Sequence, residues 1–303
     1  MKITLIASEG GAGHYPENTN YAVRHSLQGA VDGCELDFHL TADKSFVAHH
    51  DYQLKPALTR DETGLWLASP GPVIKNTSLG EFRRYEIGML DPASRVRRHY
   101  PQRASIPNEK IATLQDIEAS FIESFSEKKS DNAKLWFEAK TDPFDPDQTT
   151  PAEDYVQALK NALANSPLFP KTVLIAFDWR LLQIAQQLMP GIQTGFLSVD
   201  FSWMAKPGTK PDVDKLSGWY GDFDPRNCND SFPQAVKAAG GTYWSPYFRD
   251  IKRGDVDEAH AIGLRVSTWG ADSVEDISYA LSTGVDSLTT GYVDRAREIL
   301  KKT

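Results

Sequence analysis

The chain has 303 residues, of which 40% are hydrophobic and 24% charged, and this globular composition excludes a disordered or fibrous protein. Its 33 basic and 41 acidic residues give a formal net charge of −8, which disfavours binding to nucleic acid or to an anionic membrane surface. Two cysteines are too few for a disulfide framework or a four-thiolate zinc site. No apolar run approaches the ~20 residues that span a bilayer, and the first eight residues do not form a signal-peptide core. We therefore expect a reduced, soluble, cytoplasmic protein.

Short apolar runs alternate with amphipathic segments along the chain. The pattern predicts strands at 3–7, 34–40, 46–49, 135–139, 173–177, 194–199, 242–246, 264–269 and 286–289. It predicts helices at 18–28, 114–125, 154–165, 180–188, 233–239, 256–262, 274–282 and 293–300. This alternation favours an α/β fold, a closed TIM-type (β/α)₈ barrel, with a doubly wound open sheet as the alternative. No glycine-rich dinucleotide or Walker loop follows a strand, so the open sheet lacks its usual functional support.

Residues 52–110 interrupt the alternation. They contain six prolines and only a short helical pattern, near 79–87. Because no core pattern is evident in them, we interpret them as a long insertion over one mouth of the barrel, within a single domain spanning 1–303. The arginines of the insertion indicate either a solvated basic face or a rim that attracts anions.

Paired charged residues lie on two of the predicted strands. Glu35 and Asp37 are two positions apart, so both side chains point to one face of their strand. Two carboxylates facing a barrel interior repel each other, and a hard divalent cation such as Mg²⁺ or Ca²⁺ relieves that repulsion. Glu138 can complete a three-carboxylate site, and Lys140 can meet an anionic substrate. The alternatives are solvent-facing strands and, for Glu138 and Lys140, an internal salt bridge.

Two further segments carry groups that could act on a substrate. His49 and His50 end a short strand, where barrel enzymes place catalytic groups, and alternation allows only one of them to face the site. A glycine-rich loop follows the first strand, and its Asn18 or Thr19 can cap the next helix. The helix cap does not explain His14 and Glu17, two titratable residues of the same loop, which therefore have no structural role assigned from the sequence.

Together these segments resemble the glycerophosphodiester phosphodiesterase family. The first fifty residues carry the specific part of the resemblance, and later segments extend it over nearly the whole chain. The matching segments are Pro16-Glu17-Asn18-Thr19, Gly33-Cys34-Glu35-Leu36-Asp37, Thr41-Ala42-Asp43, His50-Asp51, Ile111-Ala112-Thr113-Leu114, Phe137-Glu138-Ala139-Lys140, Val266-Ser267-Thr268-Trp269 and Gly284-Val285-Asp286-Ser287-Leu288-Thr289-Thr290.

The resemblance implies a barrel enzyme that hydrolyses a small glycerol or sugar phosphodiester to a phosphomonoester and an alcohol. It implies Glu35, Asp37 and Glu138 as ligands of a divalent metal, Mg²⁺ or Ca²⁺. His50 would be a catalytic acid or base, and Lys140 would meet the phosphate. A metal polarises a phosphodiester oxygen and a lysine offsets the charge of the transition state, so these residue types suit that chemistry.

The chain departs from the family at the end of its first strand. The family has His-Arg-Gly there, with a catalytic histidine and a phosphate-binding arginine, whereas this chain has Ser8-Glu9-Gly10. Glu9 either turns outward, joins the metal shell or binds substrate hydroxyls. His14 could replace the missing acid or base, or a substrate hydroxyl could attack the phosphorus through a cyclic phosphate. The chain also has Gly291 where the family tends to keep an acidic residue.

Three functional hypotheses follow. The first is an altered metal-dependent phosphodiesterase with Ser8, Glu9, Glu17, Lys140 and Trp269 as substrate contacts. In it, Trp269 packs on a glycerol or sugar skeleton, with simple core packing as the alternative. The second is a conventional glycerophosphodiesterase. The third is a barrel that binds a phosphodiester without turning it over.

Overall fold

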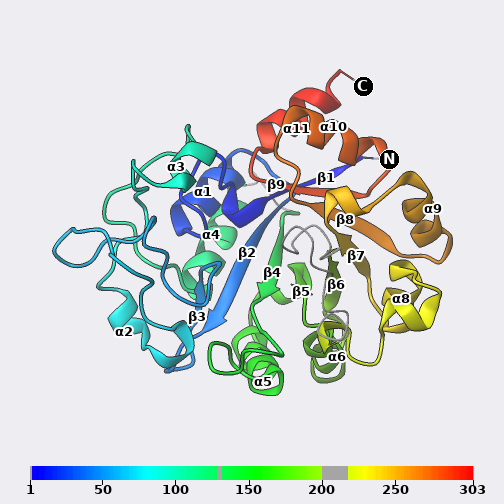
Figure 1. Ribbon diagram of the computed structural model, residues 1–303, viewed down its shortest axis with the longest axis horizontal. Coiled ribbons are helices and arrows are strands. Elements are labelled where there is room, and N and C mark those ends of the chain that lie inside the picture. The colour runs from blue at the N-terminus through cyan, green and yellow to red at the C-terminus, as the bar shows by residue number, and fades with distance from the viewer. Residues whose placement is uncertain (1, 128–131, 200–217, 303) are drawn as a thin grey trace, which may run out of the picture.

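Eight parallel strands form a closed barrel in the computed structural model, which describes residues 2–127, 132–199 and 218–302 (Figure 1). In order around the barrel they are β1 (Thr4–Ala7), β2 (Gly33–Leu40), β4 (Lys134–Ala139), β5 (Thr172–Ala176), β6 (Gln193–Ser198), β7 (Tyr243–Pro246), β8 (Arg265–Trp269) and β9 (Ser287–Thr290). Because β1 pairs with both β2 and β9, the ring of eight parallel strands is closed. The predicted (β/α)₈ barrel is confirmed, and the open sheet is excluded.

Helices cover the outside of the barrel. The main ones are α1 (Asn20–Gln28), α4 (Leu114–Ser126), α5 (Ala152–Leu163), α6 (Trp179–Leu188), α8 (Phe232–Ala238), α9 (Arg253–Ala261), α10 (Val274–Ser282) and α11 (Val293–Leu300). Side-chain caps fix several starts, as Thr113 does for α4, and left-handed glycines follow α9 and α10 at Gly263 and Gly284. No helix within the described ranges is both long and apolar enough to cross a membrane.

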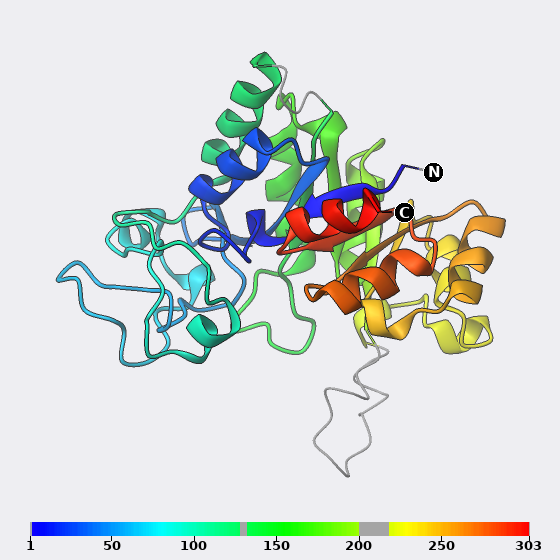
Figure 2. The ribbon, with the colours of Figure 1, turned by 90° about the horizontal axis from the view of Figure 1, so that it is seen from above.

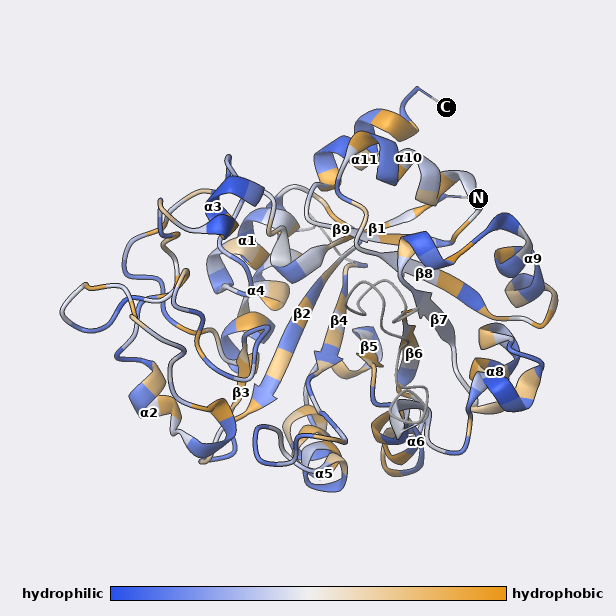
Figure 3. Cartoon of the chain, in the orientation of Figure 1, coloured by the Kyte–Doolittle hydropathy of each residue, from blue (hydrophilic) through white to orange (hydrophobic). Residues whose placement is uncertain are grey.

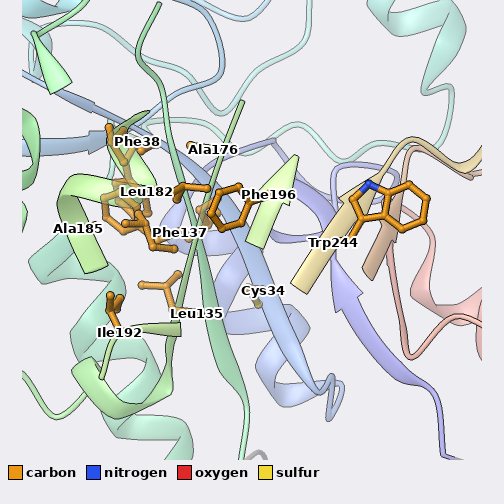
Figure 4. Close-up of a cluster of buried hydrophobic side chains, with 14 of the residues drawn as sticks. Cys34, Phe38, Leu135, Phe137, Ala176, Leu182, Ala185, Ile192, Phe196 and Trp244 are labelled. Carbon is orange, nitrogen blue, oxygen red and sulfur yellow. The ribbon is translucent and has the colours of Figure 1, made fainter. Parts of the chain in front are cut away.

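The strands are buried on both faces, and β2 presents a different chemistry on each. Cys34, Leu36 and Phe38 belong to the apolar cluster between strands and helices, where Phe38 stacks on Phe137 with ring centroids 4.1 Å apart. Figure 4 shows part of this cluster, with Phe38, Phe137 and Leu182 of α6 among the labelled residues. The intervening residues of β2 therefore face the barrel interior.

A smaller apolar cluster fills the interior of the barrel. It consists of Ile6, Trp136, Val173, Ile175, Leu197 and Tyr243, with Phe177 and Trp269 packed against it. Such packing makes the interior of a TIM barrel a solid core without a channel, and active sites of TIM barrels lie at the carboxyl ends of the strands.

The inserted segment lies on the side of the molecule away from α8 and α9, as Figures 1 and 2 agree. It follows β3 (Phe46–Ala48), which pairs antiparallel with the end of β2, and contains two short helices, α2 (Leu79–Phe82) and α3 (Arg95–His99). Figure 3 colours α3 mostly hydrophilic, and none of its residues is buried.

A buried apolar cluster lies under this segment, although no core pattern is evident in its sequence. Leu54, Ile74, Phe82 and Ile87 of the segment pack in it with two flanking residues, Val47 of β3 and Ile111. These residues occur at irregular spacings between turns, so neither the strand nor the helix period reveals them in the sequence.

Candidate active site

A cavity of about 440 Å³ lies at the carboxyl ends of the barrel strands. Most of the site residues proposed from the sequence line it: Ser8, Glu9, Glu35, Asp37, His50, Glu138, Lys140 and Trp269. His14 and Glu17 are not among the described residues that line it. The structure thus brings together side chains from both ends of the sequence.

Three buried carboxyl groups meet on one side of the cavity. Glu35 and Asp37 come from β2 and Glu138 from β4, where Asp37 and Glu138 are register partners. One oxygen from each lies within 4.8 Å of the others. Among the described residues, Glu35 Oε1 has no hydrogen-bond partner although it is buried. A cluster of hard oxygen donors with one unsatisfied buried atom suits a divalent cation.

The pKa values of this cluster reflect its crowding. Burial, followed by the charges of Asp37 and Glu138, raises the pKa of Glu35 well above its ordinary value. Burial also acts to raise the pKa of Asp37, but Lys140 and His50 outweigh it and the net shift is downward. A cation bound here would favour the ionised form of Glu35 and remove the repulsion.

Lys140 follows Glu138 on the same face. Its Nζ lies 2.6 Å from Asp37 Oδ1 and also contacts the Glu138 carboxylate. Burial alone would lower the pKa of Lys140, but these two carboxylates raise it above its ordinary value. The lysine is therefore charged, forms the internal salt bridge considered above, and still borders the cavity where an anionic substrate would lie.

The two neighbouring histidines occupy different environments. His50 lines the cavity, and its Nδ1 lies 2.6 Å from Asp51 Oδ1. Lys140 and burial act to lower the pKa of His50, but Asp37 and Asp51 outweigh them and raise it. His49 is buried away from the cavity, with Nδ1 2.9 Å from the carbonyl oxygen of Asp51. The alternation expected from the sequence therefore places His50, and not His49, in the cavity.

Ser8 and Glu9 form a short 3₁₀ turn, η1 (Ser8–Gly10), at the end of β1. The Ser8 hydroxyl and the Glu9 backbone N–H both donate to Glu35 Oε2, at 3.2 and 2.9 Å. Glu9 has a left-handed backbone with φ of 48°, and its carboxylate comes within 4.8 Å of ligand atoms of Asp37 and His50. Of the three orientations considered for Glu9, the outward one is excluded.

The Glu9 carboxyl group titrates near neutral pH. Burial, and then the charges of Glu17 and Asp37, raise its pKa to about 7, although His50 and Lys55 act in the opposite direction. A carboxyl group with such a pKa can exchange a proton under neutral conditions.

Asn18 has a role that the sequence did not reveal. Its side-chain amide donates to Asp37 Oδ2 at 2.7 Å, and its carbonyl oxygen accepts the Asp37 N–H at 3.0 Å. The helix cap belongs to its neighbour Thr19, which accepts from the N–H of Ala22. Asn18 therefore positions a candidate metal ligand, through a contact that local spacing does not encode.

Glu17 ties the insertion to the barrel. Lys55 Nζ lies 2.9 Å from Glu17 Oε1, and Arg103 Nη1 lies 2.7 Å from Glu17 Oε2. The Arg103 side chain is 1% exposed and also donates to the carbonyl oxygen of Ala12. His14, the other proposed site residue that is not among those lining the cavity, has its Nε2 2.9 Å from Asp294 Oδ1. These partners supply the structural roles that the sequence left open for both residues.

Glu17→Gln is expected to destabilise the fold by about 3–5 kcal/mol, because it leaves the Arg103 charge buried without its partner. Burial alone would raise the pKa of Glu17, but Lys55 and Arg103 lower it from 4.5 to about 2. The carboxylate thus contributes stability that is complete above pH 4.5 and is lost as the pH falls towards 2. Denaturant unfolding from pH 3 to 7 measures this effect: the difference in free energy of unfolding between wild type and variant should become smaller below pH 4.5. A difference that does not change with pH would contradict the pairing of Glu17 with Arg103 and Lys55.

The cavity is also lined by residues that were not proposed from the sequence. They include Tyr100, Phe177, Ser245, Tyr247 and Asp272. The Asp272 carboxylate accepts from Thr290 Oγ1 at 2.9 Å and from the N–H of Gly291 at 2.8 Å. A Cβ built at Gly291 would lie 3.4 Å from Asp272 Oδ1. Asp272 therefore places a carboxylate next to Gly291, the position where the family tends to have an acidic residue.

Comparison with known proteins gives a consistent result. The sequence model described as "Glycerophosphoryl diester phosphodiesterase family" matches residues 9–295. A glycerophosphodiester phosphodiesterase of Bacillus altitudinis is 23% identical over 97% of both chains. The bovine glycerophosphodiester phosphodiesterase 1 is 31% identical over 46% of this chain and 34% of its own length.

Solved structures agree in fold. A putative glycerophosphoryl diester phosphodiesterase from Silicibacter pomeroyi is 30% identical, with a TM-score of 0.86 over 99% of this chain and 93% of the other. An Oleispira antarctica phosphodiesterase, solved with the product sn-glycerol-3-phosphate, is 18% identical, with a TM-score of 0.69 over 98% and 96% of the two chains.

Proposed function

Because this chain belongs to the glycerophosphoryl diester phosphodiesterase family, we propose that it is a metal-dependent phosphodiesterase with an altered acid–base site. It is a phosphoric diester hydrolase of glycerophosphodiesters, releasing a phosphomonoester and an alcohol. Glu35, Asp37 and Glu138 hold the metal, Mg²⁺ or Ca²⁺. The observation that carries the proposal is the cluster of these three carboxyl groups, with the buried Glu35 Oε1 left unpaired.

The protein groups around this cluster bind and orient the phosphodiester. The metal, when bound, polarises a phosphodiester oxygen and makes the phosphorus more electrophilic. Lys140 adds a fixed positive charge on the same side, which lowers the energy of the more anionic transition state. Asn18 holds Asp37 in place, and Ser8 holds Glu35.

His50 is the proton donor to the departing alcohol. Its pKa is raised despite Lys140 and burial, because Asp37 and Asp51 favour the charged ring. Asp51 holds Nδ1 and so fixes the orientation of the ring, with Nε2 left for proton transfer. In this arrangement His14 takes no part.

Glu9 is the partner that takes a proton from the attacking hydroxyl. It lies close to Asp37 and His50, and its pKa of about 7, raised first by burial, suits a base at neutral pH. The attacking hydroxyl belongs either to water or to the substrate alcohol next to the phosphate. In the second route the substrate hydroxyl attacks the phosphorus and expels the alcohol, which leaves a cyclic phosphate that water then opens to the phosphomonoester.

A panel of glycerol and sugar phosphodiesters tests the proposal, with phosphomonoester release measured in the presence of Mg²⁺, Ca²⁺ or a chelator. We expect turnover of at least one glycerophosphodiester, lost with the chelator and restored by one of the two ions. Turnover that persists in the chelator would contradict the metal assignment. Phosphorus NMR during the first turnovers distinguishes direct hydrolysis from a cyclic intermediate.

Binding without turnover is the second candidate, and the observation that favours it is Ser8 in place of the family histidine. The double change of Ser8→His with Glu9→Arg separates the two candidates. If Glu9 has acquired a new role, the double variant should lose native activity by about tenfold to a hundredfold, because an unpaired polar group costs about 1–3 kcal/mol.

The wild type and the double variant are compared on the same phosphodiester panel. A wild-type protein inert on every member, together with a double variant that gains activity, would overturn the first candidate and support the second. Glu123→Arg, an exposed change on α4 that alters the net charge by the same +2 as Glu9→Arg, serves as a control for the change in net charge.

A further inference from the structure

The inserted segment contributes a hydroxyl group to the cavity. Tyr100 directly follows α3, is partly exposed, and lines the cavity together with residues of the barrel strands. Its backbone N–H donates to the carbonyl oxygen of Val96 at 2.9 Å, and its own carbonyl oxygen accepts from the N–H of Arg103 at 3.2 Å. The phenol therefore extends from an ordered turn, and the mechanism proposed above gives it no role.

Neighbouring side chains hold the ring of Tyr100 in place. The guanidinium carbon of Arg103 lies 4.0 Å from the ring centroid, and the His99 ring meets it edge-on with centroids 4.5 Å apart. Arg103 is itself fixed, because it donates to Glu17 Oε2 and to the carbonyl oxygen of Ala12. A cation over an aromatic face is attracted to it, so the ring is oriented before any ligand binds. A ligand of this ring therefore does not have to order it on binding.

The hydroxyl group of Tyr100 is available to a ligand. No described residue forms a hydrogen bond with it. Burial, and then the charges of Glu9 and Asp272, raise the pKa of Tyr100 above its ordinary value, although Arg103 acts in the opposite direction. The hydroxyl therefore remains protonated at neutral pH and lies near two carboxylates without bonding to either. A donor without a partner at the wall of a cavity is a candidate contact for a bound molecule.

The position of Glu9 relates this donor to the reacting groups. Among the charged groups that act on Tyr100, Glu9 has the largest effect. The Glu9 carboxylate also comes within 4.8 Å of ligand atoms of Asp37 and His50. Tyr100 thus belongs to the part of the cavity where the proposed function places the phosphate.

A phosphodiester in this cavity needs a donor that the barrel does not readily supply. Its negative charge is shared by two nonbridging oxygens, and a metal at the three carboxyl groups can polarise one of them. Lys140 already contacts Asp37 and Glu138. Other donors of the cavity are also engaged: the Ser8 hydroxyl donates to Glu35, Trp269 Nε1 to the carbonyl oxygen of Ser245, and Thr290 Oγ1 to Asp272.

We propose that Tyr100 is a substrate-binding residue of this site, and that its hydroxyl donates a hydrogen bond to a nonbridging phosphate oxygen. This inference rests on the proposed function and adds a residue to the same site. Because the phenol is neutral and keeps its proton, it provides a directed hydrogen bond and takes no part in acid–base catalysis. The inserted segment thereby completes the phosphate site of the barrel.

Tyr100→Phe tests the inference, because it removes the hydroxyl and keeps the ring that packs against Arg103 and His99. We expect kcat/KM to fall about tenfold to a hundredfold, the range for a hydrogen bond to a charged group. The phosphate is common to all phosphodiesters, so the loss should be of similar size for every substrate that is turned over. The pH dependence of kcat should match that of wild type, because the phenol exchanges no proton.

Tyr85→Phe is the matched control, since it makes the same change in the same inserted segment. Tyr85 packs against the buried apolar cluster of the segment and is not among the described residues that line the cavity. An equal loss in Tyr85→Phe, or a loss smaller than about tenfold in Tyr100→Phe, would overturn the inference. A changed pH profile would also overturn it, as would a loss that occurs with only one kind of alcohol.

A binding measurement separates this inference from the proposed function. If no phosphodiester is turned over by the wild type, the proposed function fails. Calorimetric titration with inorganic phosphate in the presence of Mg²⁺ then decides the inference alone. Binding that Tyr100→Phe weakens about tenfold, and that Tyr85→Phe leaves unchanged, supports it. Equal binding by wild type and Tyr100→Phe, or no binding by the wild type, refutes it.

Discussion

Glu35→Gln is expected to lower kcat/KM by about a thousandfold, equivalent to about 4 kcal/mol of transition-state stabilisation. The amide keeps the size of the side chain and one oxygen, but it removes the charge that a divalent ion needs. It also removes a carboxyl group whose pKa is raised by burial and by its neighbours Asp37 and Glu138. An acid with a raised pKa destabilises the folded state at neutral pH, so the metal-free variant should be at least as stable as metal-free wild type.

Two measurements separate these effects. Calorimetric titration with Mg²⁺ and Ca²⁺ should show weaker binding by the variant, and unfolding in chelator should show no loss of stability. Glu123→Gln, an exposed change on α4, is the matched control and should alter neither. Metal affinity equal to that of wild type would refute the assignment of Glu35, whereas a large loss of stability would reduce it to a structural role.

His50→Gln is expected to reduce kcat by about 10²–10⁴-fold, the range for removal of a general acid. The reason is that the departing alkoxide of a natural alcohol is a strong base and needs a proton as the bond breaks. A nitrophenyl phosphodiester releases a phenolate that needs no proton. The loss with this substrate should therefore be much smaller.

His49→Gln is the matched control for His50, because it changes the same residue type one position earlier. His49 lies outside the cavity and bonds to the carbonyl oxygen of Asp51, so its replacement should affect stability more than relative rates. If His49→Gln lost activity while His50→Gln retained it, the strand register assumed here would be wrong. An equal loss on both kinds of leaving group would mean that His50 positions the substrate and does not protonate the alcohol.

Much of the barrel could be predicted from the sequence because its strands are short apolar runs separated by amphipathic helices. The boundaries of β2 and α10 illustrate this, since the predicted and observed ranges differ by at most one residue. The placement of Glu35 and Asp37 on one face follows from the two-residue period of a strand. Because a strand has a fixed period, the spacing of two residues in the sequence determines whether their side chains point to the same face. The three carboxyl groups of the cavity could be predicted for this reason.

The rest of the cavity depends on contacts that no period encodes. Asn18 and Asp37 are 19 residues apart, and Glu17 and Arg103 are 86 apart. Asp272 lies in a loop after a strand, where backbone turns decide the direction of a side chain. Sequence reasoning therefore proposed Glu17 for substrate binding, whereas the structure shows it in ion pairs with Lys55 and Arg103.

The ion pairs of Glu17 have a consequence for the evolution and engineering of this barrel. Both cations, Lys55 and Arg103, belong to the inserted segment, while the carboxylate belongs to the loop after β1. Replacing the inserted segment by that of another barrel would leave the Glu17 carboxylate without its cationic partners unless residue 17 were replaced at the same time. The inserted segment and the loop after β1 therefore have to be inherited together, and a chimera should take both from the same parent barrel.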